Sequence, residues 1–137
     1  MKVRYLLWVI VIIAITLLVD WDDEKDALSD LTRIDVKFKS NKSETEKIIT
    51  DSYVLDEVRG NYNNIRWEEN VKPSMDREPD VKATFFYQYD KNQPEYLVEY
   101  FIWFDESVDA TIIDPQKHRY GRLDSENGKK LRELFMN

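Results

Sequence analysis

The chain has 137 residues, of which 42% are hydrophobic and 34% charged, and its 27 acidic residues outnumber its 20 basic ones. This length and composition are typical of one globular domain and exclude a collagen-like or low-complexity chain. The absence of Cys excludes a disulfide framework, a thiolate metal site, a Cys nucleophile and a lipid-modified Cys. The excess of negative charge argues against nucleic acid as a partner.

The N-terminus carries the most apolar segment of the chain. Tyr5 to Val19 contains no charge, and extending it to Val3 gives about 17 residues, the lower limit for crossing a bilayer. Lys2 and Arg4 lie in or before this stretch, whereas every acidic residue follows it. By the positive-inside rule, we predict a transmembrane anchor over residues 1–19, with membrane contact through residues 3–19. The N-terminus would be cytoplasmic and the C-terminal domain extracytoplasmic, in a single-pass protein of the cell membrane.

A cleaved signal peptide is the alternative interpretation of the same segment, and it would make the protein secreted. Its weakness is the cleavage site, because the nearest small-x-small sequence is Ala27-Leu28-Ser29, beyond an acidic stretch. Residues 20–33 are highly charged and are predicted to be an acidic juxtamembrane tether. The acids of this tether lack the Gly turn and the distal Glu of a calcium-binding loop, so no metal site is predicted there.

Residues 34–137 are predicted to form the extracytoplasmic domain. Ile34 to Lys39 alternates apolar and charged residues, which is typical of a half-buried strand. Ser43 to Glu46 has the S-x-x-E form of a capping box and predicts a helix to about Arg59. Residues 61–80 contain Asn-rich and Pro-containing pieces and are predicted to be a long connection.

The second half of the domain is predicted to be a meander of strands. Val81–Tyr89 and Tyr96–Phe104 form a hairpin, followed by the shorter strands Ala110–Ile113 and Arg119–Leu123. Asp124 or Ser125 then caps a last helix. The predicted order is β-α-β-β-β-β-α. The predicted fold class is therefore α+β, in which an N-terminal transmembrane helix precedes a small domain with an antiparallel sheet of about five strands and two helices.

Several of these segments carry a family resemblance. They are Pro79-Asp80, Tyr100 to Phe104, Thr111 to Asp114, Tyr120 to Leu123, and the paired Leu131 and Leu134. In this order they resemble the small extracytoplasmic domains of Gram-positive bacteria, among them the YhfM-like domain, over roughly residues 34–136. The resemblance implies a fold and a location but no catalytic residue, because the activity of that family is not established. Members are often lipoproteins, whereas this chain lacks the required Cys.

The usual catalytic sets are absent from the sequence. The one histidine, His118, falls in a predicted turn, and no Cys or second His completes a nucleophilic or zinc set. The sequence contains no glycine-rich phosphate-binding motif. Asp76, Glu78 and Asp80 form an acidic cluster that is interpreted as a solvated loop. We therefore predict no catalytic residue, no metal and no cofactor.

Aromatic residues supply the candidate binding surface. Half of the aromatic residues of the chain lie between Phe85 and Phe104, and strand alternation sends them to both faces of the sheet. Exposure of Phe86, Phe101 and Trp103 would create a partner site. The alternative is that the 61–80 connection covers this face with Ile65 and Trp67 and makes these aromatic residues core.

These observations lead to two hypotheses about function. The favoured one is a membrane-anchored, extracytoplasmic and noncatalytic domain that binds a protein partner at the cell envelope. The alternative is a small ligand-binding module or a carboxylate-based enzyme acting on an envelope component, which requires a concave site with convergent acids. The oligomeric state and the identity of any partner do not follow from the sequence.

Overall fold

The computed structural model describes residue 3, residues 28–71 and residues 74–137. By its internal contacts the chain divides into residues 1–30 and residues 31–137, and the second unit contains the sheet and helices described below. In the described part of the chain, no helix is both long and apolar enough to cross a membrane. Apart from residue 3, the predicted anchor over residues 1–19 lies outside the described residues, as does most of the predicted tether.

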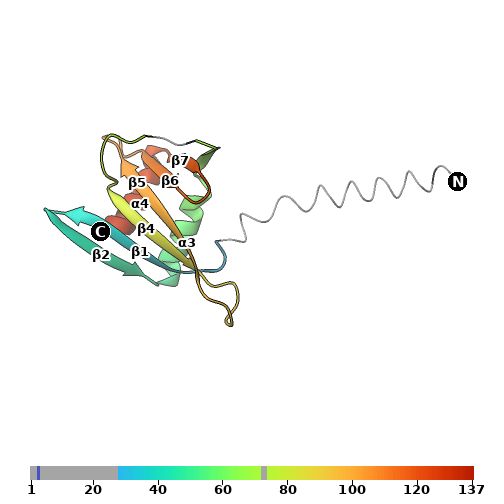
Figure 1. Cartoon of the computed structure of the whole chain (residues 1–137). Helices are drawn as coiled ribbons and strands as arrows, with labels where there is room; N and C mark the ends of the chain where they lie inside the picture. The colour runs from blue at the N-terminus through green and yellow to red at the C-terminus, as the bar shows by residue number, and fades with distance from the viewer. Residues whose placement is uncertain (1–2, 4–27, 72–73) are drawn as a thin grey trace. The chain divides into compact units, whose positions relative to one another are not determined.

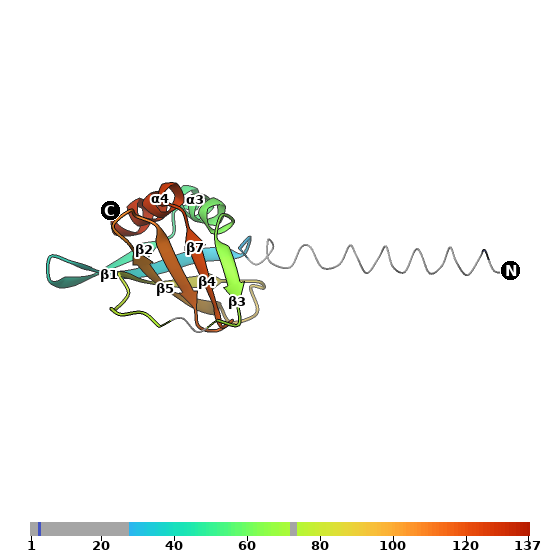
Figure 2. The same ribbon diagram turned by 90° about the horizontal axis from the view of Figure 1, so that it is seen from above.

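An antiparallel sheet forms the frame of residues 31–137 (Figure 1). The described residues contribute seven strands to it, in the spatial order β2-β1-β4-β5-β6-β7-β3. The strands are β1 (Leu31–Ser40), β2 (Ser43–Ile49), β3 (Arg66–Glu69), β4 (Val81–Tyr87), β5 (Tyr96–Phe104), β6 (Ala110–Asp114) and β7 (Arg119–Leu123). Helices α3 (Ser52–Tyr62) and α4 (Ser125–Met136) lie side by side on one face, here called the inner face (Figure 2).

The predicted fold class is corrected by this architecture. The described order is β-β-α-β-β-β-β-β-α, with seven strands and two helices, instead of about five strands in the order β-α-β-β-β-β-α. The sheet thus makes up more of the domain than predicted. The two additional strands, β2 and β3, are the two edges of the sheet.

Strand β2 occupies most of the segment predicted as the start of a helix. Asn41 and Lys42 both have positive φ, 48° and 72°, which is the backbone of the tight turns that join two antiparallel strands. The Ser43 hydroxyl donates a hydrogen bond to the Ser40 carbonyl across this turn instead of capping a helix. The actual helix cap is Asp51, whose carboxylate accepts a hydrogen bond from the Val54 amide at 3.1 Å.

Strand β3 was missed because it is short and lies inside the predicted 61–80 connection. It pairs with β7, which is far from it in sequence, and its tertiary partner decides its conformation. The other predictions of strands agree with the structure to within a few residues. The last helix is also confirmed, with Asp124 as its cap, because the Asp124 carboxylate accepts a hydrogen bond from the Asn127 amide.

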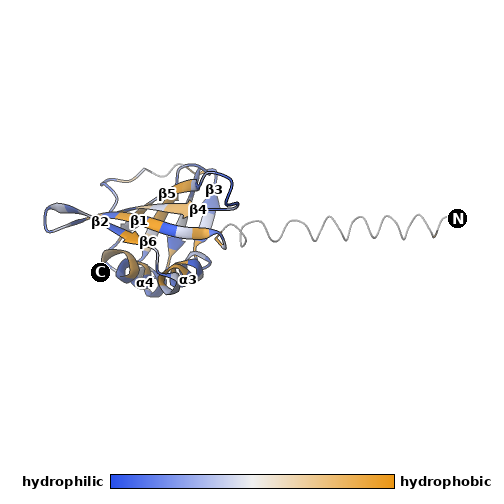
Figure 3. Cartoon of the chain, turned by 90° about the horizontal axis from the view of Figure 1, so that it is seen from below, coloured by the Kyte–Doolittle hydropathy of each residue, from blue (hydrophilic) through white to orange (hydrophobic). Residues whose placement is uncertain are grey.

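The core lies between the inner face of the sheet and the two helices. Alternate residues of the central strands point inwards, among them Ile34, Val36, Val81, Ala83 and Ile102, and all of these are almost completely buried. Phe85 contacts Phe135 of α4 edge to face. Figure 3 shows hydrophobic residues along the middle of the sheet and hydrophilic residues at the tip of the β1–β2 hairpin.

Gly121 of β7 makes a close approach possible on this inner face. A Cβ atom at Gly121 would lie 2.3 Å from Ile65 Cγ2 and 2.9 Å from Trp67 Cε3. Both contacts are too short for carbon atoms, so Ile65, just before β3, and Trp67, within β3, need the space left by this glycine. The pairing of β3 with β7 thus depends on the missing side chain.

We therefore expect Gly121→Ala to lower the free energy of unfolding by about 1–3 kcal/mol, because overpacking displaces Ile65 and Trp67. The matched control is Gly60→Ala on α3, where a Cβ atom would meet nothing within 4 Å. Alanine is the better helix former, so the control is expected to raise the stability by about 0.5–1 kcal/mol. Urea denaturation of both variants measures the difference, and equal effects of the two substitutions would contradict the packing argument.

Candidate functional site

The three aromatic residues predicted as a binding surface lie on the outer face of the sheet, opposite the helices. Phe86 is only 9% exposed, and the Arg33 guanidinium lies 3.7 Å from the centre of its ring. Trp103 is 7% exposed, and its indole N–H donates to the Arg77 carbonyl at 2.9 Å. Phe101 is half-buried. Of the three side chains, therefore, Phe86 and Trp103 are covered by other parts of the chain.

The connection between β3 and β4 provides this cover at Trp103, although not through the residues expected. The Arg77 carbonyl accepts the hydrogen bond from the Trp103 indole. Ile65 and Trp67, which were expected to cover this face, pack instead on the inner face against Gly121. The same connection bonds to the sheet at the Asp80 amide, which donates to the Ile102 carbonyl.

Two of the three acids in the cluster of this connection, Glu78 and Asp80, are paired with basic side chains of the chain itself. Glu78 forms an exposed ion pair with Lys39, and the hydrogen bond from Lys39 lowers the pKa of the Glu78 carboxyl. The Asp80 carboxylate accepts hydrogen bonds from the Arg77 guanidinium and from the Phe104 amide. Burial alone would raise the pKa of Asp80, but these bonds and the charge of Arg77 hold it below its ordinary value. Lowered pKa values are the opposite of what a catalytic acid needs.

A buried ion pair lies at the opposite side of the sheet, between β6 and β7. Asp114 is 0% exposed and Arg119 is 2% exposed, and their side chains are 3.4 Å apart. The guanidinium also lies 3.9 Å from the centre of the Trp67 ring and donates to the Tyr62 hydroxyl at 2.8 Å. Asp114 in turn accepts from the amides of the following turn, at Gln116 and Lys117. Every strong charge here is satisfied inside the protein.

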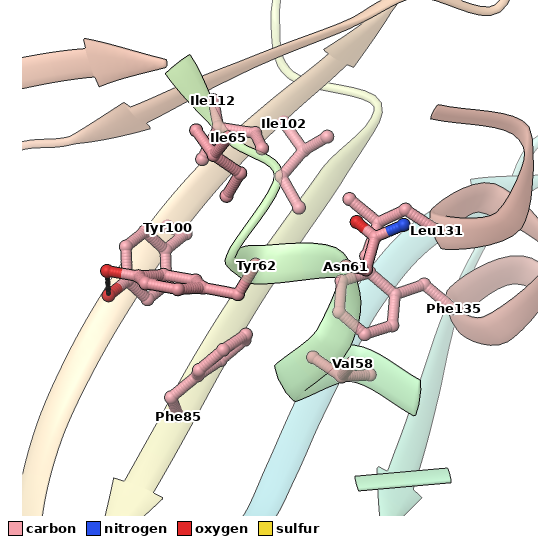
Figure 4. Close-up of a pocket in the computed structure, with 10 residues that line it drawn as sticks. All are labelled: Val58, Asn61, Tyr62, Ile65, Phe85, Tyr100, Ile102, Ile112, Leu131 and Phe135. Carbon is pink, nitrogen blue, oxygen red and sulfur yellow. Dashed lines mark hydrogen bonds between the residues drawn. The ribbon is translucent and has the colours of Figure 1, made fainter. Parts of the chain in front are cut away.

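Two tyrosine hydroxyls continue this network into the core (Figure 4). Tyr62 and Tyr100 have their hydroxyl oxygens 3.4 Å apart. Burial is the main cause that raises the pKa of Tyr100, and it does the same for Tyr87 on the neighbouring strand. The phenols of Tyr100 and Tyr87 therefore remain protonated at any physiological pH.

The cavity beside Tyr62 and Tyr100 is too small for a substrate. Its volume is about 20 Å³, roughly the space of one water molecule. Figure 4 shows that it is surrounded by apolar side chains from both helices and from the sheet, among them Val58, Phe85, Ile102, Leu131 and Phe135. This region is consequently part of the core.

An open hollow of about 390 Å³ lies where β3 meets the end of β7. We call it the β3 hollow, and it is lined by Arg66, Trp67, Glu68, Asp109, Arg122, Leu123 and Asp124. In the described part of the chain, the side chains of Arg66, Glu68, Asp109 and Arg122 have no hydrogen-bond or ion-pair partner. Asp124 differs, because its carboxylate caps α4.

Tertiary pairing creates the β3 hollow. Arg66 lies directly opposite Arg122 in the register of β3 and β7, and Glu68 follows Arg66 by two residues and so lies on the same face. Alternation in the sequence predicts the strand Arg119–Leu123, but nothing in the sequence singles out Arg66, Arg122 or Glu68 as site residues. The alternating R-W-E-E sequence was the only local signal for β3, and four residues are too few to be distinguished from a loop.

His118 and a metal site are the remaining candidates from the sequence. His118 lies in the turn between β6 and β7, with a φ of 50°, as the sequence analysis placed it. Among the described residues, no group of three His, Cys, Asp or Glu side chains could hold a metal ion.

Comparison with known proteins adds one structural likeness. The chain is similar in fold to a thioesterase-like protein from Clostridium sporogenes ATCC 15579, with a TM-score of 0.54 and 23% sequence identity. The match covers 80% of this chain and 97% of that chain. No family model matches the sequence, and no curated protein matches it either. The resemblance to the YhfM-like domain therefore stays a prediction.

The favoured functional hypothesis is corrected by these findings. A noncatalytic, membrane-anchored domain that binds a protein partner was predicted, but the fold is shared with a thioesterase-like protein. The membrane part of that hypothesis concerns residues 1–19, which apart from residue 3 lie outside the described residues. The expectation that the protein is not an enzyme is replaced below by a proposed activity.

The lowered pKa of Asp80 predicts that the bonds by which Asp80 fixes the β3–β4 connection to the sheet weaken in acid. Because the pKa of Asp80 is lower in the folded than in the unfolded chain, its ionised carboxylate stabilises the fold above about pH 4. This contribution is lost as the pH falls through the pKa of the folded state. Asp80→Asn should lower the free energy of unfolding at pH 7 by about 1–3 kcal/mol, and the deficit should shrink towards pH 3. Asp76→Asn in the same connection is the control and should have little effect. Denaturant titrations at both pH values test this, and a deficit that does not depend on pH would contradict it.

The buried ion pair predicts strong coupling between Asp114 and Arg119. Arg119→Met leaves a buried carboxylate without its cation and should lower the free energy of unfolding by about 3–5 kcal/mol. The double variant with Asp114→Leu should recover part of this loss, because it removes the orphaned charge. Urea denaturation of the two single variants and the double variant gives the coupling energy. Strictly additive losses would show that the two side chains act independently.

Proposed function

We propose that the domain is a hydrolase that cleaves the ester or thioester bond of a small acyl compound bound in the β3 hollow. The observation that carries the proposal is that two carboxylates, Glu68 and Asp109, line the same hollow, which is large enough for a small molecule, and that neither has a hydrogen-bond or ion-pair partner among the described residues. The likeness to a thioesterase-like protein supports the choice of bond.

The shape of the hollow suits such a compound. Trp67 and Leu123 are the apolar residues of the lining, and the other lining residues are charged. Ligand sites commonly combine an apolar wall with a few polar groups that orient the molecule. The fully buried cluster of Arg119 and Asp114 lacks such access, and the cavity beside Tyr62 lacks the volume.

The chemistry would be general base catalysis. One carboxylate, Glu68 or Asp109, takes a proton from a water molecule as the water oxygen attacks the acyl carbon. The bond from that carbon to sulfur or oxygen then breaks, and the proton passes to the leaving thiolate or alkoxide. The products are a carboxylic acid and a thiol or an alcohol. Positioned carboxylates contribute about 10²–10⁴-fold to such steps.

Thiol release from acyl thioesters of increasing chain length is the direct test. The protein has no Cys, so a thiol-reactive dye reports only the product thiol. With the full-length chain we expect hydrolysis of at least one thioester or aryl ester. Glu68→Gln or Asp109→Asn should lower kcat by about a hundredfold or more.

Glu57→Gln on the exposed surface of α3 is the matched control and should keep full activity. The proposal fails if no ester or thioester is hydrolysed. It also fails if both hollow variants remain as active as the control, because the activity would then come from elsewhere.

A further inference from the structure

The most unusual electrostatic feature of the β3 hollow is a pair of adjacent arginines. Arg66 and Arg122 are direct cross-strand partners on β3 and β7, and both side chains are exposed. Directly opposite residues of antiparallel strands have Cβ atoms about 4.5–5.5 Å apart. Two positively charged side chains in directly opposite positions repel each other, and like charges in such positions destabilise a sheet.

Among the described residues, no carboxylate forms an ion pair with either of these arginines. Neither guanidinium has a hydrogen-bond or ion-pair partner among the described residues, whereas Arg59, Arg77 and Arg119 each have a carboxylate partner. The two guanidiniums thus offer uncommitted donors towards the same hollow. Guanidinium groups match the geometry of phosphate and carboxylate oxygens and bind them in pairs of hydrogen bonds.

We propose that Arg66 and Arg122 together bind a phosphate group carried by a small molecule in the β3 hollow. A phosphate has several oxygens and up to two negative charges, so it accepts from both guanidiniums at once and relieves their repulsion. This inference deepens the proposed function and rests on it in one respect, since it identifies the substrate as a phosphorylated acyl compound. The binding itself does not require turnover.

The acidic residue Glu68 determines whether the affinity for phosphate should rise or fall in one of the test variants. Glu68 lies on the same face as Arg66, two residues away on β3, and its negative charge opposes a bound anion. Removal of this charge should therefore strengthen phosphate binding, and where Glu68 is the catalytic base it should weaken the proposed hydrolysis. In that case, one variant moves the two properties in opposite directions.

The experiment is a titration of the full-length chain with inorganic phosphate at constant ionic strength, followed by NMR and by thermal unfolding. We expect saturable binding that shifts the side-chain signals of Arg66 and Arg122 and raises the Tm. Arg66→Gln and Arg122→Gln should each weaken the binding about tenfold, as expected for loss of a charge-assisted hydrogen bond. Glu68→Gln should tighten it. Arg132→Gln, on α4 and outside the hollow, is the matched control and should leave it unchanged.

The Tm of the protein without phosphate distinguishes arginines that bind an anion from arginines that only stabilise the fold. Because the arginines repel each other, Arg122→Gln should keep or raise the Tm of the free protein, whereas a structural arginine would lower it. Acetate, which carries one charge, should bind more weakly than phosphate. Equal binding of the two anions would assign the site to carboxylates and overturn the choice of phosphate.

The proposal is overturned if phosphate binding does not saturate, or if the two arginine variants bind as well as the Arg132 control. Phosphate binding without hydrolysis of any ester would leave the anion site standing and refute the proposed function. Hydrolysis without phosphate binding would do the reverse.

Discussion

The pairing of β3 with β7 is the constraint on which the functional part of this molecule depends. It requires a residue without a side chain at Gly121, because Ile65 and Trp67 occupy the space where a Cβ would lie. Once β3 is in place, Arg66 lies opposite Arg122 and the β3 hollow is complete. A single packing requirement on the inner face therefore decides which charged side chains meet on the outer face.

Trp67 links this packing to the electrostatics of the core. Its ring packs over Gly121 and also lies against the Arg119 guanidinium, which is paired with the fully buried Asp114. A buried pair stabilises a fold only when its remaining donors and acceptors are satisfied. The Tyr62 hydroxyl and the turn amides at Gln116 and Lys117 perform that role here. Such a network holds β6, β7 and β3 in one arrangement.

Charged residues thus fall into two classes in this domain. Arg119, Asp114, Arg77 and Asp80 are committed to internal bonds and hold strands and the connection in place. The side chains of Arg66, Arg122, Glu68 and Asp109 have no hydrogen-bond or ion-pair partner in the described part of the chain, and they line the β3 hollow. Uncommitted charges beside an apolar wall are what a ligand can use, whereas committed ones are already neutralised.

Local patterns determined most of the elements, and long-range pairing decided the candidate site. The aromatic strands β4 and β5, the two short strands after them and the helix capped by Asp124 follow from alternation and capping in neighbouring residues. The S-x-x-E sequence at Ser43 misled because the hairpin turn at Asn41 and Lys42 and pairing with β1 outweighed a weak capping preference. Strand β3 and the arginine pair depend on contacts between residues more than fifty positions apart. No local pattern encodes such contacts, so only the tertiary structure could bring Arg66 to Arg122.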